Sequence, residues 1–145
     1  DIRWLRKQTT LPLVIKGLLS PQDAQRASHE GADGIVVSNH GGRVLDHAIP
    51  PLDALAHIVD AVGAKIPILF DSGIRRGTDI LQALSLGASA VLIGRPQLHA
   101  LAVAGMAGVA HILQILRIEL ELAMAQTGCR SISGIDQHLL TKVRS

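Results

Sequence analysis

One pattern occurs twice in the sequence, and this repeat limits the folds that the chain can adopt. Residues 30–37 read Glu-Gly-Ala-Asp-Gly-Ile-Val-Val, and residues 86–93 read Leu-Gly-Ala-Ser-Ala-Val-Leu-Ile. Residues 12–17 and 67–73 form a second pair at the same offset of about 55 residues, which is the length of two βα units. In residues 30–37 and in residues 86–93, a glycine ends a helical stretch and an apolar run follows. This pattern predicts a helix and then a buried strand. The sequence therefore predicts an α/β fold of repeated βα units.

Capping residues and helix breakers divide the rest of the chain into alternating strands and helices. Ser20 followed by Pro21 predicts the start of one helix, and Thr78 predicts the start of another. The expected strands are residues 11–17, 34–37, 66–71 and 90–93, and the expected helices are residues 2–7, 21–30, 52–62, 79–86 and 108–126, with a short turn or helix after residue 131. Four βα units in series form half of a TIM (β/α)8 barrel, and a small, open, doubly wound sheet is the alternative.

The composition fits a helix-covered parallel sheet and argues against several other classes. Hydrophobic residues make up 48% of the chain, yet it has one Trp, one Phe and no Tyr, so the core is aliphatic, as in parallel sheets. The mean hydropathy of +0.33 favours a segment whose apolar surface is covered by the rest of a larger protein. A net charge of +2 without a basic cluster argues against nucleic-acid binding. The single cysteine excludes an intrachain disulfide, and the histidines lack metal-ligand spacing, so we expect no metal site.

A long stretch without charged residues, from residue 96 to residue 116, has two interpretations. We interpret it as a loop followed by a packed helix, and a transmembrane span is the alternative. The first seven residues do not have the pattern of a signal peptide. Together with the low cysteine content, this predicts a cytoplasmic protein.

The unusual polar residues follow the predicted strands at their carboxyl ends. They are Lys16, residues 38–43, residues 71–76, and the pair Gly94 and Arg95. In a TIM barrel this edge holds the active site. His40 offers a base and Arg43 a fixed cation on one glycine-rich loop, a combination that suits removal of a proton from an anionic substrate.

The last two strand ends also predict a phosphate site. Gly73, Gly77 and Gly94 would open backbone N–H groups to an anion. The helix that starts at Thr78 would add its dipole. TIM barrels often bind phosphate after their last two strands, which supports this interpretation.

The cations at this edge have a ligand-binding and a structural interpretation. In the first, Arg95 and one of the two arginines at 75–76 bind the phosphate, and Lys16 binds an anion or takes part in catalysis. In the second, the arginines are solvated or pair with Asp71 and Asp79, and Lys16 forms a salt bridge with Asp71 across the mouth of the barrel.

Four motifs, in this order, closely resemble the FMN-dependent α-hydroxy acid oxidase and dehydrogenase family. They are residues 14–17 (VIKG), 38–43 (SNHGGR), 71–77 (DSGIRRG) and 93–96 (IGRP). The family includes glycolate oxidase, lactate oxidase, L-lactate dehydrogenase, L-mandelate dehydrogenase and flavocytochrome b2. The resemblance extends to about residue 135 and implies that residues 1–145 are the C-terminal half of the family's TIM-barrel domain, strands five to eight.

The resemblance implies FMN as cofactor and a role for each motif residue. His40 would be the catalytic base, and Arg43 would bind the substrate carboxylate. Lys16 would stabilise the reduced flavin. The other residues that the resemblance assigns to cofactor binding are Ser38, Gly41, Asp71, Ser72, Gly73, Arg75, Gly94 and Arg95. The sequence departs from the family at Val44, where Gln is frequent, and at Ser72, where many members have Gly.

The resemblance also implies what the whole enzyme does. It would oxidise an (S)-2-hydroxy acid such as lactate, glycolate or mandelate to the 2-oxo acid and pass electrons through FMN to O₂, a quinone or a cytochrome. It would be a homo-oligomer, cytoplasmic or peripheral at the inner membrane. Family members place substrate-binding tyrosines in the N-terminal half, and this chain has no Tyr, so we expect the isolated segment to be inactive.

Two alternatives to this function remain open. One is another FMN-binding or phosphate-binding TIM-barrel enzyme. The other is a non-catalytic or truncated half-barrel that binds phosphate or FMN, or that self-associates through its open sheet edges.

Overall fold

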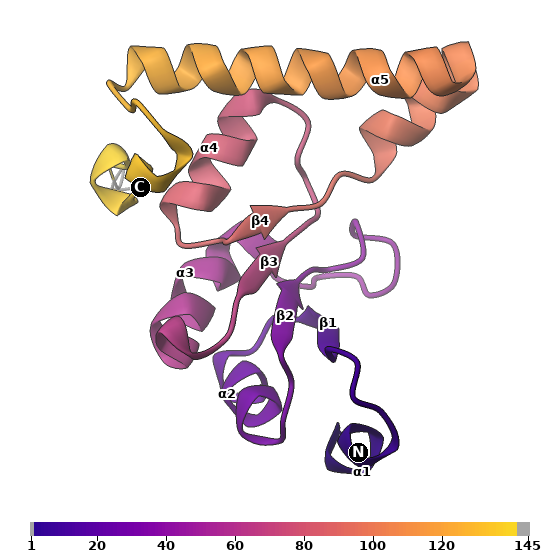
Figure 1. Cartoon of the computed structure of the whole chain (residues 1–145), viewed down its shortest axis with the longest axis vertical. Coiled ribbons are helices and arrows are strands. Elements are labelled where there is room, and N and C mark those ends of the chain that lie inside the picture. Colours follow the sequence, from indigo (N-terminus) through magenta and orange to yellow (C-terminus); the bar gives the residue numbers. More distant parts are fainter. Residues whose placement is uncertain (1, 142–145) are drawn as a thin grey trace.

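Four parallel strands lie side by side in the same order in space as in the sequence (Figure 1). The structure is a computed structural model that describes residues 2–141, so the predicted domain of residues 1–145 extends past the described residues at both ends. The strands are β1 (Val14–Leu18), β2 (Gly34–Val37), β3 (Ile68–Phe70) and β4 (Ala90–Val91), and the helices are α1 (Ile2–Gln8), α2 (Pro21–His29), α3 (Pro51–Val62), α4 (Gly77–Ser85) and α5 (Arg95–Gln126). Short 3₁₀ turns are η1 (Gly63–Lys65), η2 (Ile132–Gly134) and η3 (Gln137–Leu139). A helix follows each strand, which confirms the predicted alternation.

The strand order distinguishes between the two predicted architectures. A doubly wound sheet reverses its strand order at a switch point and has helices on both faces. Here the order β1-β2-β3-β4 has no reversal, and α2, α3 and α4 lie along one side of the sheet (Figure 1). Consecutive βα units of a TIM barrel have this arrangement, so the chain is a partial barrel and the doubly wound alternative is wrong.

The two faces of the sheet have different environments because side chains alternate along each strand. The side chains that face the helices form the core with α3. These core residues include Ile35, Val37, Ile68 and Phe70 of the strands and Leu55, Ile58 and Val62 of α3. On the opposite face, the side chains of Val14 and Leu92 are exposed, at 47% and 40%. In a complete barrel this opposite face is the interior.

Most element boundaries agree with the predicted ones. The limits of β2 are those predicted, and Ser20 caps α2, since its side chain accepts a hydrogen bond from the backbone N–H of Asp23 at 3.3 Å. β1 starts at Val14, later than predicted. The preceding backbone N–H, that of Leu13, donates to the carboxylate of Asp33 at 2.7 Å instead of to a neighbouring strand.

The start of α4 differs from the prediction. Thr78 lies inside the helix, and Arg76 occupies the N-cap position. The carboxylate of Asp79 accepts hydrogen bonds from the backbone N–H groups of Arg75 and Arg76, each at 2.9 Å. The side chain that accepts hydrogen bonds from the N–H groups before the helix is therefore that of Asp79, and the predicted cap at Thr78 is wrong.

The largest difference concerns α5, which begins at Arg95 and not at the predicted residue 108. Gly94 precedes it, and Pro96 lies in its first turn, where proline favours a helix start. Ala104 and Gly105 have non-helical backbone angles, so the helix bends there. By length and composition α5 could cross a membrane, and 6% of its apolar 18-residue window is buried in this structure. The predicted loop at the start of the uncharged stretch is therefore helical.

α5 lies against the start of α4 at a point where only glycine fits. A Cβ atom on Gly77 would lie 2.1 Å from the backbone nitrogen of Leu120. The backbone N–H of Gly77 also donates to the carboxylate of Glu119 at 2.8 Å. These contacts fix the segment between β3 and α4 relative to α5.

We predict that Gly77→Ala lowers the free energy of unfolding of the full-length protein by about 3 kcal/mol, because the atoms that the new methyl group meets are backbone atoms that cannot rotate away. Chemical denaturation measures this change. Gly134→Ala is the control, since its Cβ would meet only the Oγ of Ser131 at 3.5 Å, and we expect a change below about 0.5 kcal/mol. A Gly77→Ala variant of wild-type stability would contradict the close α4–α5 contact.

Candidate functional site

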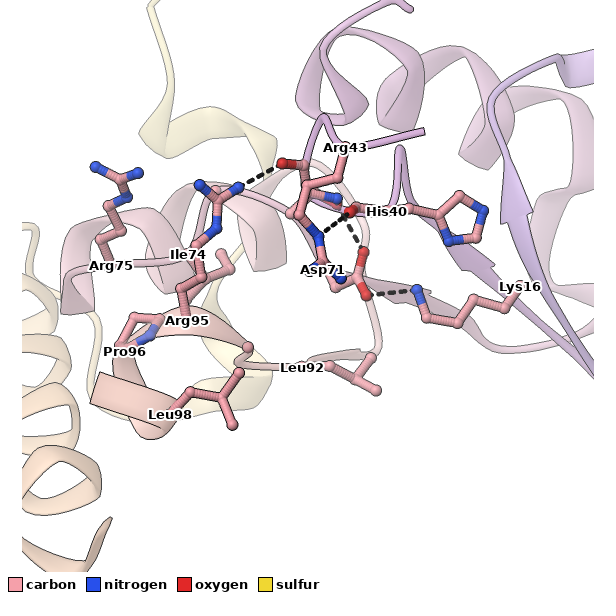
Figure 2. A pocket seen from close by; sticks show the side chains of 14 residues that line it. Lys16, His40, Arg43, Asp71, Ile74, Arg75, Leu92, Arg95, Pro96 and Leu98 are labelled. Atoms are coloured by element: carbon pink, nitrogen blue, oxygen red, sulfur yellow. Dashed lines mark hydrogen bonds and ion pairs between the residues drawn. The ribbon is translucent and has the colours of Figure 1, made fainter. Parts of the chain in front are cut away.

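An open cavity of about 330 Å³ lies at the carboxyl ends of the four strands (Figure 2). Of the residues to which the family resemblance assigns a role, all except Ser38 line it. The lining residues among them are Lys16, His40, Gly41, Arg43, Asp71, Ser72, Gly73, Arg75, Gly94 and Arg95. Lys16 and His40 lie at one end of the cavity, and Arg75 and Arg95 lie at the other, as Figure 2 shows.

An ion pair between Lys16 and Asp71 connects β1 with the end of β3. The Nζ of Lys16 lies 2.6 Å from the Oδ2 of Asp71 and donates a second hydrogen bond, of 2.8 Å, to the Oγ of Ser38. The predicted structural alternative for Lys16 is therefore present. Its side chain is also 43% exposed, so the ammonium group faces the cavity as well. Ser38 is fully buried behind it.

The surroundings of Asp71 keep its carboxyl group ionised. Burial acts to raise the pKa of Asp71, but hydrogen bonds from Lys16, Ser38 and Ser72 and the charge of Lys16 together hold this pKa below its ordinary value of 3.8. The carboxylate is therefore charged at neutral pH and can orient the Lys16 ammonium group.

The loop after β2 presents His40 in a left-handed backbone conformation, with a φ of +57°. The backbone N–H of His40 donates to the Oγ of Ser38 at 3.1 Å, and the next N–H, that of Gly41, donates to the Oγ of Ser72 at 3.1 Å. A Cβ on Gly17 would lie 2.8 Å from the Nε2 of His40. Gly17 therefore leaves space for the imidazole. Its position directly after Lys16 could have indicated this role in the sequence.

Arg43 and Arg95 both contact the same loop. The Nε of Arg43 donates to the carbonyl oxygen of His40 at 3.5 Å. The Nη2 of Arg95 donates to the carbonyl oxygen of Gly41. Arg95 thus connects the cationic end of the cavity with the loop that carries His40.

The start of α4 does not offer its N–H groups to a ligand. The backbone N–H groups of Arg75 and Arg76 donate to Asp79, and that of Gly77 donates to Glu119. The predicted contribution of the Gly77 N–H to an anion site is therefore wrong. Sequence reasoning missed Glu119 because it lies on α5, 42 residues away along the chain.

The start of α5 remains available to an anion. First-turn N–H groups have no partner within their own helix, and a Cβ on Gly73 or Gly94 would meet no atom within 4 Å. Within residues 2–141, the guanidinium groups of Arg75 and Arg76 form no ion pair. Together with Arg95, this end of the cavity can bind a phosphate.

Apolar side chains form the remaining wall of the cavity, and none of them was predicted to be a site residue. They are Ile74, Leu92, Pro96 and Leu98. In Figure 2, Leu92 and Leu98 lie below the polar groups. Strand alternation could have placed Leu92 on this face, whereas Leu98 lies in a stretch for which we predicted a loop. The cavity thus combines an apolar wall with two charged ends.

Comparison with known proteins shows close relatives over nearly the whole chain. The model of the FMN-dependent dehydrogenase family matches residues 1–142. An L-lactate oxidase of Nostoc sp. is 56% identical over 140 residues, which are 97% of this chain and 38% of the relative. A peroxisomal (S)-2-hydroxy-acid oxidase of Oryza sativa is 48% identical over 143 residues, which are 98% of this chain and 39% of that protein. The chain therefore spans less than half the length of the curated relatives it matches.

A solved structure has the same fold. It is a soluble mutant of the membrane-associated (S)-mandelate dehydrogenase from Pseudomonas putida, with a TM-score of 0.93 and 48% identity. The match covers 97% of this chain and 40% of that protein. The partial barrel described above is thus present in a larger protein.

We predict that Lys16→Met raises the pKa of Asp71, because burial of the carboxyl group remains while its ammonium partner is lost. In the wild type, the lowered pKa stabilises the fold above pH 3.8, and this contribution disappears as the pH falls below 3.8 through the folded-state value. In the variant the folded-state pKa is higher, so this contribution shrinks: the protein is less stable at neutral pH and loses less stability on acidification than the wild type.

Unfolding free energies measured from neutral to acid pH test this prediction. Lys65→Met is the control, since Lys65 is exposed in η1, and its pH dependence should equal that of the wild type. An unchanged profile in Lys16→Met would show that the ion pair does not control Asp71.

We further predict that Glu119→Ala lowers the free energy of unfolding by about 1–3 kcal/mol, because the buried N–H of Gly77 loses its acceptor. Glu121→Ala on the same helix is the matched control. Among the described residues 2–141, Glu121 pairs with the exposed Arg117 alone, at 2.8 Å, so we expect a loss of about 0.5 kcal/mol or less. Equal losses in a denaturation experiment would exclude a special role of Glu119.

Proposed function

Since this chain belongs to the FMN-dependent dehydrogenase family, we propose that the protein that contains it oxidises an (S)-2-hydroxy acid such as lactate, glycolate or mandelate to the 2-oxo acid. One observation carries this proposal: His40 and Arg43 of one loop line the same cavity as the Lys16–Asp71 ion pair. Bound FMN supplies the acceptor for the two electrons that the substrate loses.

The residues of the cavity fit FMN, which joins a planar ring to a phosphate. Arg75, Arg95 and the open backbone at Gly94 supply a cationic end for the phosphate. Leu92 supplies an apolar surface for the ring, and Lys16 supplies a hydrogen-bond donor at the opposite end. We assign cofactor binding to these residues together with Ser38, Gly41, Asp71 and Gly73, and to the main chain at Ser72, since the hydroxyl group of Ser72 is bonded to Asp71 and to the N–H of Gly41.

In the proposed mechanism, His40 and Arg43 act on the substrate. The Nε of Arg43 is already bonded to the carbonyl oxygen of His40, so its two Nη groups remain for a bidentate pair with the substrate carboxylate. This pair fixes the substrate beside the imidazole. His40 then takes a proton from the substrate onto a ring nitrogen. Lys16, held by Asp71, would donate a hydrogen bond to bound FMN, and its positive charge would stabilise the reduced form of the cofactor.

We also propose that the chain is the C-terminal half of the barrel domain. The exposed Val14 and Leu92 lie on the helix-free face of the sheet, and the N-terminal half would cover this face and complete the substrate pocket. The isolated chain is therefore expected to be inactive and, because it exposes apolar surface, to self-associate.

The same proposal includes an electron acceptor, an oligomeric state and a cellular location for the whole protein. The electron acceptor is O₂, a quinone or a cytochrome, and the protein is a homo-oligomer, which the exposed Val103 and Met106 on α5 support. We place it in the cytoplasm or, like the membrane-associated relative from Pseudomonas putida, at a membrane surface.

The absorption spectrum of the purified full-length protein tests the proposed function. It is recorded before and after anaerobic addition of L-lactate, glycolate or L-mandelate, and we expect at least one of them to bleach the flavin absorption. Flavin that none of them bleaches would contradict the substrate class. A protein that binds no flavin, even after FMN is added, would contradict the cofactor.

We predict that His40→Asn slows reduction of the bound flavin by the active substrate about 10²–10⁴-fold, because the group that accepts the proton is lost. FMN should remain bound, since other residues hold it. Stopped-flow absorption measures the rate, and His57→Asn, an exposed change on α3, is the control with wild-type kinetics. Wild-type kinetics in His40→Asn would show that another group takes the proton.

A further inference from the structure

Ser72 has a backbone conformation that favours glycine. Its φ is +75°, and within residues 2–141 only two other non-glycine residues, His40 and His47, have positive φ values. A Cβ atom makes this region unfavourable. Such strain persists only where the surrounding structure holds the residue in place, and it is concentrated at functional sites. The side chain of Ser72 must therefore make contacts that offset this strain.

The hydroxyl group of Ser72 is fully engaged within the protein. It donates to the Oδ1 of Asp71 at 2.9 Å and accepts from the backbone N–H of Gly41 at 3.1 Å. The Oγ of Ser38 lies 3.5 Å away. The Oγ of Ser38 accepts from Lys16 and from the N–H of His40, and its own proton is donated to Asp71. One hydroxyl thus connects the end of β3 with the loop after β2.

These contacts hold the peptide units on both sides of His40. Its own N–H is bonded to Ser38, and the following N–H, that of Gly41, is bonded to Ser72. His40 itself has a left-handed backbone conformation, so the direction of the imidazole depends on these two bonds. Replacing Ser72 would free the second of them while leaving every side chain of the proposed reaction in place.

We propose that Ser72 is a positioning residue: through the N–H of Gly41 it holds the loop that carries His40 and Arg43 in a fixed place relative to the Lys16–Asp71 ion pair. This inference rests on the proposed function, in which His40 is the base. It gives the hydroxyl group a role between two loops of the protein and not on the cofactor.

Two substitutions separate the hydroxyl from the backbone strain. Ser72→Ala removes the hydroxyl and keeps the strain, whereas Ser72→Gly removes both. We expect both variants to lower the limiting rate of flavin reduction about tenfold, the effect of losing one hydrogen bond. The dissociation constant for FMN should be that of the wild type, and Ser72→Gly should have a higher Tm than Ser72→Ala. Ser85→Ala, a buried serine of α4 that bonds only to Leu81, is the control with wild-type kinetics.

Amide hydrogen exchange in the full-length protein tests the hydrogen bond without reference to activity. The amide of Gly41 should exchange faster in both Ser72 variants. The amide of Gly42, which is bonded to Asn39, should be unchanged and serves as the internal reference. If the wild-type flavin is reduced by no 2-hydroxy acid, the proposed function fails, and exchange at Gly41 still decides whether Ser72 holds the loop.

Two results would overturn the proposal. Unchanged exchange at Gly41 in the Ser72 variants would show that the serine does not hold this loop. A weaker affinity for FMN with a wild-type rate of reduction would show that the hydroxyl group serves the cofactor instead.

Discussion

The ion pair between Lys16 and Asp71 is the interaction on which the candidate site depends. It crosses from β1 to the end of β3, and the buried Ser38 at the end of β2 completes it with a hydrogen bond to Lys16. Three neighbouring strands are thereby joined at the edge that borders the cavity. Because loss of one partner leaves a charge without compensation, the pair fixes the strand ends as well as the direction of the ammonium group. The ion pair that joins the strands also lines the cavity.

Backbone strain is concentrated at the same edge of the sheet. His40 and Ser72 both have left-handed conformations where the chain leaves β2 and β3. Hydrogen bonds from the loops, not apolar packing, offset this strain, since the backbone N–H groups of His40 and Gly41 are bonded to serine hydroxyls. A buried apolar core below the strands supplies the rigid support that such a loop needs. The structure thus separates a stable core from a strained, polar edge.

The two helix starts near the cationic end of the cavity have opposite properties. At α4, the N–H groups are occupied by the carboxylates of Asp79 and Glu119. At α5, the backbone beside Gly94 is open. Two carboxylates at α4 would repel a phosphate, whereas the guanidinium of Arg95 at the start of α5 would attract one. In the proposed site, repulsion and attraction would therefore act together on the position of the anion.

Most local elements and the polar residues at the strand ends could be predicted from the sequence. Apolar runs, glycines and the cap at Ser20 specify their own short segments, because their effects act within one turn or one strand. The bend of α5 and most long-range partners of the polar groups depend on tertiary structure, although the Lys16–Asp71 pair was one of the predicted alternatives. Glu119 reaches Gly77 from 42 residues away, and Ser72 meets the N–H of Gly41 from 31 residues away. Such contacts leave no periodic signal in a sequence, since they exist only once packing has brought distant segments together.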